Sequence, residues 1–177
     1  KQTLSNEDLF VIFRNNKLIL LYLLKNNLMA IDDTIIRFVD TNFFYPEIND
    51  QKGIEKVDNT KNDDDILFDQ KRSIGENDSY VCQLIRYDAI DEFSIYVTQN
   101  NLSLNYTIKP SIFESNHFLI ERMKDSQKVE LIEYAAFFGS IQIINFLIKN
   151  KIKMVPSLWL FAIHSRNADL IHLLACR

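Results

Sequence analysis

Residues 131–148 read LIEYAAFFGSIQIINFLI, and residues 158–175 read LWLFAIHSRNADLIHLLA. A shift of 27 positions superimposes the two stretches, so that Ala135 falls on Ala162. In each stretch a short apolar segment precedes a polar turn and a second segment with paired aliphatic residues. A unit that recurs with a period of about 20–50 residues is typical of stacked helical arrays. We therefore predict an all-α fold built from helical pairs.

The N-terminal part of the chain carries a more distant version of this pattern. The segment 17–25, KLILLYLLK, aligns with the second helix of the last unit, with leucines opposite leucine or isoleucine. Ser5 or Asn6 is a suitable N-cap for another helix, which would precede the segment 17–25. We expect residues 1–48 to form a diverged repeat, and residues 80–177 to form the helical repeats proper and to continue beyond the last residue given.

Residues 49–79 lose the helical spacing of apolar positions. Asp, Asn and Lys dominate this stretch, and Asp63, Asp64 and Asp65 form a short acidic run. Such a composition buries too little apolar surface to offset the conformational entropy lost on folding. We expect a mobile or disordered insertion here. The acidic run lacks the alternating ligands, central glycine and closing glutamate of a calcium loop, so no metal site is expected.

The composition argues against several classes of function. The net charge is −4 and the basic residues are dispersed, so nucleic acid is not an expected partner. The 3 glycines lie too far apart for a phosphate-binding loop. His117, His164 and His172 lie outside any zinc-binding or catalytic pattern. We expect no enzyme activity, no catalytic residue, no cofactor and no metal.

The sequence also bears on the compartment. The longest apolar run, Leu18 to Leu24, is far shorter than the roughly 20 residues that a membrane-spanning helix needs. Cys82 and Cys176 are the only cysteines and do not make a disulfide framework. We therefore expect a cytoplasmic protein without a membrane span. The chain begins at Lys1, and we interpret it as a piece of a longer protein.

The unit at residues 131–148 resembles the ankyrin repeat. In that pattern Ala-Ala is followed by two variable residues, a glycine and a helix with paired aliphatic residues. Here Ala135 and Ala136 precede Gly139 at this spacing. The residues 130–133 replace the usual Thr-Pro-Leu-His start, and the shift of 27 is shorter than the usual period of about 33. A shortened hairpin between units accounts for the difference.

A closer resemblance is carried by YTIKPSIFESNHFL, LIEYAAFFGSIQIINFL and PSLWLFAIHSRNADLIHLL. These phrases are similar to the N-terminal domain of unknown function that precedes the ankyrin repeats in a divergent protein family of protozoan parasites. The resemblance covers residues 80–177 most fully and residues 1–48 more loosely. It implies an ankyrin-like helical array, or solenoid, and it implies no particular activity.

Helical arrays of this kind usually bind other proteins. We therefore predict a protein–protein interaction module whose protein partner is not identified. Alignment with the ankyrin pattern puts Glu133, Phe137, Leu160 and His164 on the inner helices, where they could contact that partner. The alternative is an N-terminal capping or oligomerisation module with a structural role, since terminal repeats are atypical. Because the array is expected to continue, the aliphatic residues of 170–174 should be partly exposed in the isolated chain, which should therefore self-associate.

Overall fold

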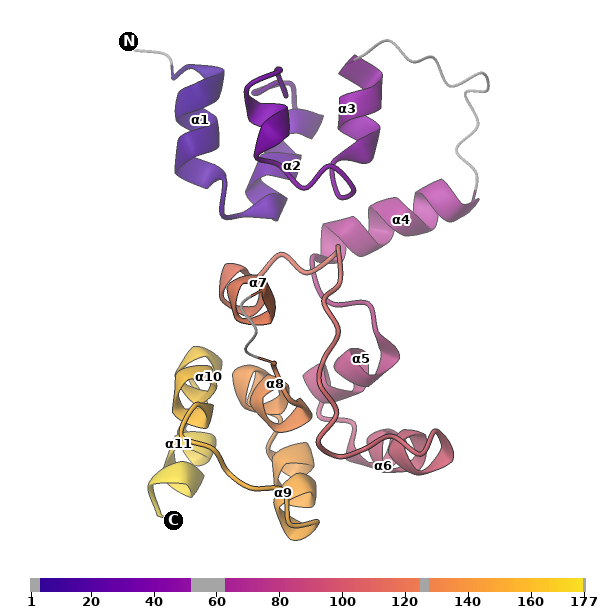
Figure 1. Ribbon diagram of the computed structural model, residues 1–177, viewed down its shortest axis with the longest axis vertical. Coiled ribbons are helices and arrows are strands. Elements are labelled where there is room, and N and C mark those ends of the chain that lie inside the picture. The colour runs from indigo at the N-terminus through magenta and orange to yellow at the C-terminus, as the bar shows by residue number, and fades with distance from the viewer. Residues whose placement is uncertain (1–3, 52–62, 125–127, 177) are drawn as a thin grey trace. The chain divides into compact units, whose positions relative to one another are not determined.

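The computed structural model describes residues 4–51, 63–124 and 128–176 (Figure 1). Within these ranges the regular structure consists of eleven α-helices and one short 3-10 helix. An isolated β-bridge between Thr107 and Glu130 adds the only strand-like pairing of the described residues. The prediction of an all-α fold is confirmed.

Contacts divide the chain into two compact units. The first comprises Lys1–Asn77 and Ser111–Ile120, and the second comprises Asp78–Pro110 and Glu121–Arg177. The division at residue 78 lies close to the expected start of the repeats at residue 80. The first unit is larger than the expected segment 1–48, because it also takes in much of the expected insertion.

The helices of the first unit are α1 (Asn6–Phe13), α2 (Lys17–Lys25), the 3-10 helix η1 (Ile35–Arg37), α3 (Tyr45–Gln51) and α4 (Asp63–Ile74). Of the two expected caps of α1, the structure uses Ser5. Its hydroxyl accepts a hydrogen bond from the Asp8 N–H at 3.1 Å, and the Asp8 carboxylate accepts one from the Ser5 N–H at 3.0 Å. This reciprocal arrangement is a capping box, which satisfies two backbone donors at the start of the helix.

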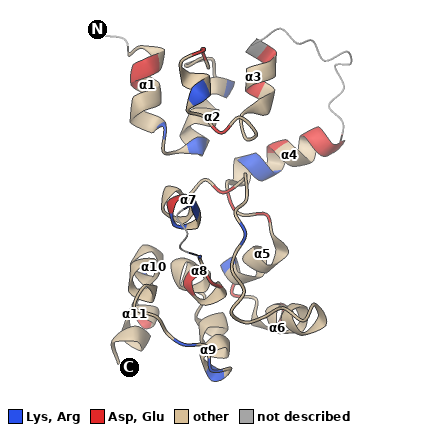
Figure 2. Ribbon diagram, in the orientation of Figure 1, with Lys and Arg blue, Asp and Glu red and all other residues tan. Residues whose placement is uncertain are grey.

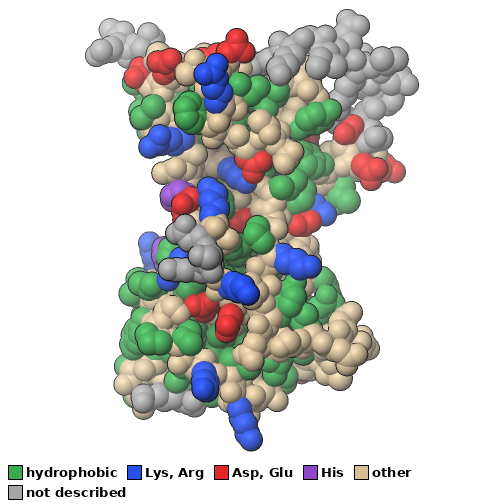
Figure 3. All heavy atoms as spheres, in the orientation of Figure 1, with side chains coloured by type: hydrophobic (Ala, Val, Ile, Leu, Met, Phe, Trp, Pro, Cys, Tyr) green, Lys and Arg blue, Asp and Glu red, His purple; other side chains and the backbone are tan. Residues whose placement is uncertain are grey.

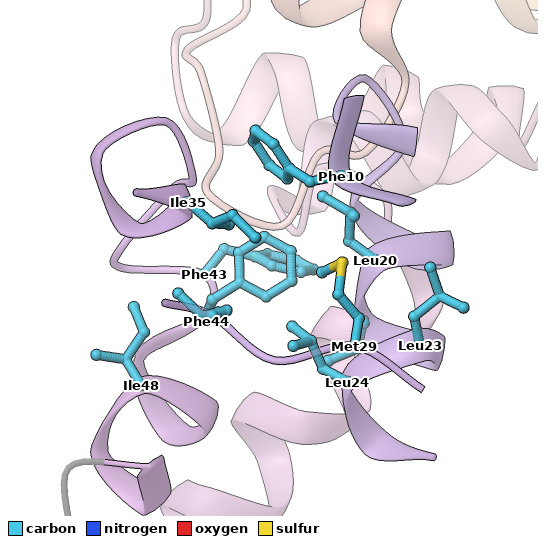
Figure 4. Packing of buried hydrophobic residues seen from close by; sticks show 11 residues of the cluster. Phe10, Leu20, Leu23, Leu24, Met29, Ile35, Phe43, Phe44 and Ile48 are labelled. Atoms are coloured by element: carbon cyan, nitrogen blue, oxygen red, sulfur yellow. The ribbon is translucent and has the colours of Figure 1, made fainter. Parts of the chain in front are cut away.

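Two consecutive phenylalanines lie at the centre of the first unit (Figure 4). Phe43 lies between Ile35 of η1 and Leu20 of α2, and Phe44 meets it edge to face with ring centroids 4.8 Å apart. Both rings are completely or almost completely buried. Because full burial of one such side chain contributes about 1.5–3 kcal/mol, this pair is a main source of stability for the unit.

Helix α4 lies inside the stretch 49–79, for which the composition predicts a mobile or disordered insertion. The structure corrects that expectation for residues 63–74, which form a helix with a buried contact. Three aspartates lie in its first turn and two basic residues in its last turn, as the helix dipole favours (Figure 2). Residues 52–62 of the predicted insertion lie outside the described part of the chain.

Arg72 supplies the buried contact of α4 and is only 1% exposed. Its guanidinium donates to Glu47 at 2.7 and 3.0 Å, to the Phe43 carbonyl at 2.8 Å and to Asp69. Desolvation disfavours the charged form, but the hydrogen bonds to Glu47 and Asp69 outweigh it and raise the pKa of Arg72 above its ordinary value. A network of ions and hydrogen bonds therefore attaches α4 to the rest of the first unit.

The second unit contains three helical pairs in chain order: α5 (Tyr80–Arg86) with α6 (Ile90–Gln99), α8 (Leu131–Phe138) with α9 (Ile141–Lys149), and α10 (Leu158–Ser165) with α11 (Ala168–Ala175). Helix α7 (His117–Lys124) precedes the second pair and crosses the boundary between the units in sequence. Helix α8 packs on both α5 and α10, and α9 packs on α6, so the first helices of neighbouring pairs lie side by side (Figure 1).

Each pair of the second unit turns at one residue with a left-handed backbone. These residues are Asp88 (φ 48°), Gly139 (φ 71°) and Arg166 (φ 53°). Gly139 and Arg166 are related by the same shift of 27 positions that superimposes the sequences. A left-handed residue at the end of a helix satisfies carbonyls that would otherwise lack partners. The predicted glycine turn therefore recurs, although only one of the three residues is a glycine.

A second recurring feature ends α2, α6 and α9. Each helix is followed by an asparagine whose side-chain amide donates to a carbonyl four residues earlier, and the next residue is left-handed. The bonds, all 2.8 Å long, are Asn26 to Tyr22, Asn100 to Tyr96 and Asn150 to Phe146, and the left-handed residues are Asn27, Asn101 and Lys151. The shared helix end supports the prediction that α2 is a diverged version of the second helix of a pair.

Candidate interaction surface

Polar residues at the turns hold the three helical pairs of the second unit together. The Asp88 carboxylate, from the first turn, accepts the Gln142 and Ile143 N–H groups at 3.0 Å each and thereby caps α9. The Ser140 hydroxyl, from the second turn, donates to the Ile85 carbonyl at 2.5 Å. Because these bonds join neighbouring pairs, they fix the register in which α8 packs against α5.

The third pair is attached in a similar way. The Asn167 side-chain amide donates to the Gly139 carbonyl at 3.2 Å, and its carbonyl oxygen caps α11. Asn167 and Ser140 are related by the shift of 27 positions. In both pairs, the polar residue that directly follows the left-handed residue donates a side-chain hydrogen bond to the preceding pair. This residue is the signal that can be recognised in the sequence.

The sequence predicts that Glu133 contacts a partner, but the structure places this side chain in a largely buried position. Glu133 is only 7% exposed. Its carboxylate accepts the Glu130 N–H at 3.0 Å and the Ser157 hydroxyl at 2.6 Å. The side chain is buried because Ser157, at the start of α10, closes over it. Glu133 therefore links the first turn of α8 to the next pair and is not part of an open surface.

The other three predicted residues reach the surface on α8 and α10. Phe137 is half-buried, Leu160 is 49% exposed and His164 is exposed. The rings of Phe137 and His164 lie 5.2 Å apart at 30°. Leu160 and His164 are four residues apart on α10, so they share one side of that helix. The structure thus brings these three side chains together.

A row of ring contacts connects this surface to the core of the second unit. Tyr134 is fully buried and receives a hydrogen bond from Arg86 of α5 at 3.2 Å. Its ring lies 4.9 Å from that of Phe138, which lies 5.0 Å from Phe137. We call Tyr134, Phe138, Phe137 and His164 the aromatic row. Because each ring is held by the next, the exposed end of the row is positioned by the packing of α5, α8 and α10.

A second apolar surface lies on the last helical pair. Trp159 and Ile163 of α10 are 40% and 63% exposed, and Ile171 of α11 is 37% exposed. We call these three residues the edge face. Hydrophobic side chains gather over α10 in the space-filling view (Figure 3). The sequence predicts partial exposure along residues 170–174, which holds for Ile171 and the half-buried leucines 173 and 174 but is wrong for the fully buried Leu170.

A polar pocket of about 370 Å³ lies in the second unit, lined by Arg122, Lys128, Val129, Glu133, Ser157 and Phe161. The Arg122 guanidinium lies over the Phe161 ring at 5.6 Å from its centroid. Both oxygens of Glu133 are already engaged by Glu130 and Ser157. Ser157 and Glu133 therefore bond to each other at this pocket and link α8 to α10.

The described residues include no group of three or more His, Cys, Asp or Glu side chains placed to hold a metal ion. None of the helices described is long and apolar enough to cross a lipid bilayer. Of the two cysteines, Cys82 is buried and Cys176 is exposed, and neither is in a disulfide.

Comparison of the chain with protein-family models, curated proteins and solved structures gives no match. The ankyrin-like interpretation therefore depends on the sequence pattern and on the helical pairs described above. The features that bear on function are the exposed end of the aromatic row on α8 and α10 and the edge face on α10 and α11.

Proposed function

We propose that the second unit is a protein-binding module, an ankyrin-like helical array without catalytic activity. The observation that carries the proposal is the exposed end of the aromatic row, where Phe137 and His164 lie beside Leu160. Aromatic residues dominate the binding energy of protein interfaces, because they bury a large area with few rotatable bonds. Residues of α5 and α8 hold this end in place, so little ordering is needed when a partner binds.

The arrangement of the helices supports an ankyrin-like solenoid. Three consecutive pairs have a left-handed turn residue, and α8 packs on the first helices of both neighbouring pairs. In such arrays the first helices line one surface, which is commonly the binding surface. Two cysteines that are not joined in a disulfide suit a reducing compartment, so we include a cytoplasmic location in the proposal.

Photo-crosslinking tests the proposed binding surface. A photoreactive amino acid replaces Leu160 in one variant and Ile95 of α6 in a second, since these residues are similarly exposed at 49% and 55%. We expect a discrete protein adduct from position 160 that is absent from position 95. Adding Phe137→Asp to the first variant should abolish the adduct while the helical content stays unchanged. Identical adducts from both positions would contradict the proposal.

The second candidate function is an N-terminal capping or oligomerisation module with a structural role. The observation that favours it is the edge face, which exposes three large apolar side chains on neighbouring helices. Exposed apolar clusters mark interaction sites or a tendency to aggregate. Sedimentation of the chain over a range of concentrations tests oligomerisation. Self-association that Ile163→Asp removes would support it, and a chain that stays monomeric would count against it.

A further inference from the structure

We propose that the edge face is the docking site for one more helical pair of the same kind as α8–α9 and α10–α11. The proposal deepens the capping function and rests on it, because it names the chemistry of the segment that the last pair would receive. The occupant is an apolar helical pair with Ser or Asn directly after its left-handed turn. Three observations in the second unit lead to this occupant.

The first observation is the burial of equivalent positions in the preceding pair. A shift of 27 positions gives each residue of the edge face a counterpart in α8–α9. All three counterparts are buried, with exposures of 0%, 1% and 1% for Ile132, Ala136 and Ile144, against 40%, 63% and 37% for Trp159, Ile163 and Ile171. The same three positions of a helical pair are therefore buried in α8–α9 and solvent-exposed in α10–α11.

The direction of these side chains identifies what buries them. Trp159 and Ile163 are exposed, so they point away from α8 and α11, the helices on which α10 packs. Ile132 and Ala136 hold the same positions on α8 and so point away from α5 and α9. They are buried because α10 packs on the remaining side of α8. Where these positions of α8 are covered, the covering element is therefore the first helix of the next pair.

The second observation concerns the hydrogen bonds between turns. Ser140 donates to the backbone of the pair before it, and Asn167 donates to the carbonyl of Gly139. Each donor directly follows a left-handed residue. The counterpart of the Gly139 carbonyl in the last pair is the carbonyl of Arg166. A docking pair with Asn at its turn would repeat this bond, and one with Ser would make the kind of bond that Ser140 makes, to a carbonyl of α10.

The third observation is the charge of the last pair, which distinguishes a helical pair from an anionic membrane surface. Helix α10 contains no Lys, Arg, Asp or Glu, and α11 contains only Asp169 (Figure 2). Helices that bind anionic membranes carry Lys and Arg beside their apolar face. The edge face also spans both α10 and α11, which suits a pair better than a single helix.

The test uses the fluorescence of Trp159, which is the only tryptophan of the chain. In an engineered chain, residues 151–177 are repeated once after the last residue, which preserves the spacing of 27. The tryptophan of the added copy is replaced by phenylalanine, so that Trp159 remains the only tryptophan. A second engineered chain adds Ile163→Ala, which restores the alanine found at the counterpart position 136 in case the isoleucine is too large. Measurements are made at concentrations where sedimentation shows a monomer.

We expect docking of the added pair to bury Trp159 in at least one engineered chain. Its emission should shift to shorter wavelength, and its acrylamide quenching constant should fall at least about two-fold, because a side chain that is 40% exposed becomes buried. Ile163→Asp should reverse both changes in the first chain. The matched control, Ile95→Asp on the exposed side of α6, should leave both changes intact.

Unchanged quenching in both engineered chains, with the added segment helical by circular dichroism, would overturn the proposal. Self-association of the original chain that protects Trp159 and depends on Ile163 would also overturn it. That second result would assign the edge face to another copy of the chain and leave the oligomerisation function standing.

Discussion

At the scale of single residues, Glu133 makes the clearest difference between pattern and structure. A glutamate in the first turn of a helix is ordinarily solvated, and the sequence places Glu133 on the binding side of the array. The residue that buries it, Ser157, lies 24 positions later. Spacing within one helix cannot reveal a contact made by the next helical pair. Leu160 and His164 are exposed and Phe137 is half-buried, so these three predicted residues do reach the surface of α8 and α10.

We predict that Glu133→Ala lowers the free energy of unfolding by about 1–3 kcal/mol, because the Glu130 N–H and the Ser157 hydroxyl lose their acceptor. Glu92→Ala, at an exposed position in the first turn of α6, should change it by less than about 0.5 kcal/mol. Urea denaturation of both variants is the measurement. Equal effects at the two positions would mean that Glu133 is solvated.

A second residue-scale prediction concerns Asp88, which combines a left-handed backbone with the cap of α9. Asp88→Ala removes the acceptor of two N–H groups and places alanine at φ 48°, so we expect a loss of about 1–2 kcal/mol. Asp88→Asn keeps one acceptor oxygen and a residue that tolerates this backbone, and should lose less. Thermal denaturation of the two variants measures both losses. A larger loss for Asp88→Asn than for Asp88→Ala would contradict the prediction.

The capping box of α1 predicts a dependence on pH. The backbone and side-chain hydrogen bonds from Ser5 hold the pKa of Asp8 below its ordinary value. Since the folded pKa is depressed, the stabilisation is present above the ordinary pKa and is lost as the pH falls through the folded one. NMR titration of the Asp8 carboxyl should show the low pKa, and Ser5→Ala should raise it towards the ordinary value. An Asp8 pKa that is the same with and without Ser5→Ala would exclude the capping box.

At the scale of elements, the helical pairs at 131–148 and 158–175 were predictable because their signals are local. Apolar spacing, small residues and a turn residue all lie within about twenty positions. Helix α4 was not predictable from composition, because it depends on Arg72 and on Glu47, 25 residues earlier. The asparagines that end α2, α6 and α9 are also a local signal for a helix end. A prediction based only on the spacing of hydrophobic residues does not use it.

The buried ion network gives the prediction for α4. Arg72→Met leaves Glu47 without its bidentate partner at a site where that side chain is only 13% exposed. Removing one partner of a buried pair is expected to lower the free energy of unfolding by about 3–5 kcal/mol. Gln70→Ala, at an exposed position of the same helix, is the control. Hydrogen exchange should show that α4 amides lose protection in the first variant only, and protection in both would contradict the role of Arg72.

At the scale of the whole molecule, the two units have different sources of order. The first has a core of leucines and phenylalanines, to which α4 is attached by Arg72. The second repeats one helical pair, and bonds between turns set the register of each pair against the one before it. Both proposed surfaces belong to this second unit, and both require that α10 stacks on α8.

The measurement that tests this stacking most directly is an NMR nuclear Overhauser effect between the side chains of Phe137 and His164. Their ring centroids lie 5.2 Å apart although the residues belong to different helical pairs. The account predicts clear cross-peaks between the two rings, which Phe137→Ala removes. An absence of these cross-peaks, while the helical signals of α8 and α10 persist, would show that the pairs do not stack and would contradict both proposed surfaces.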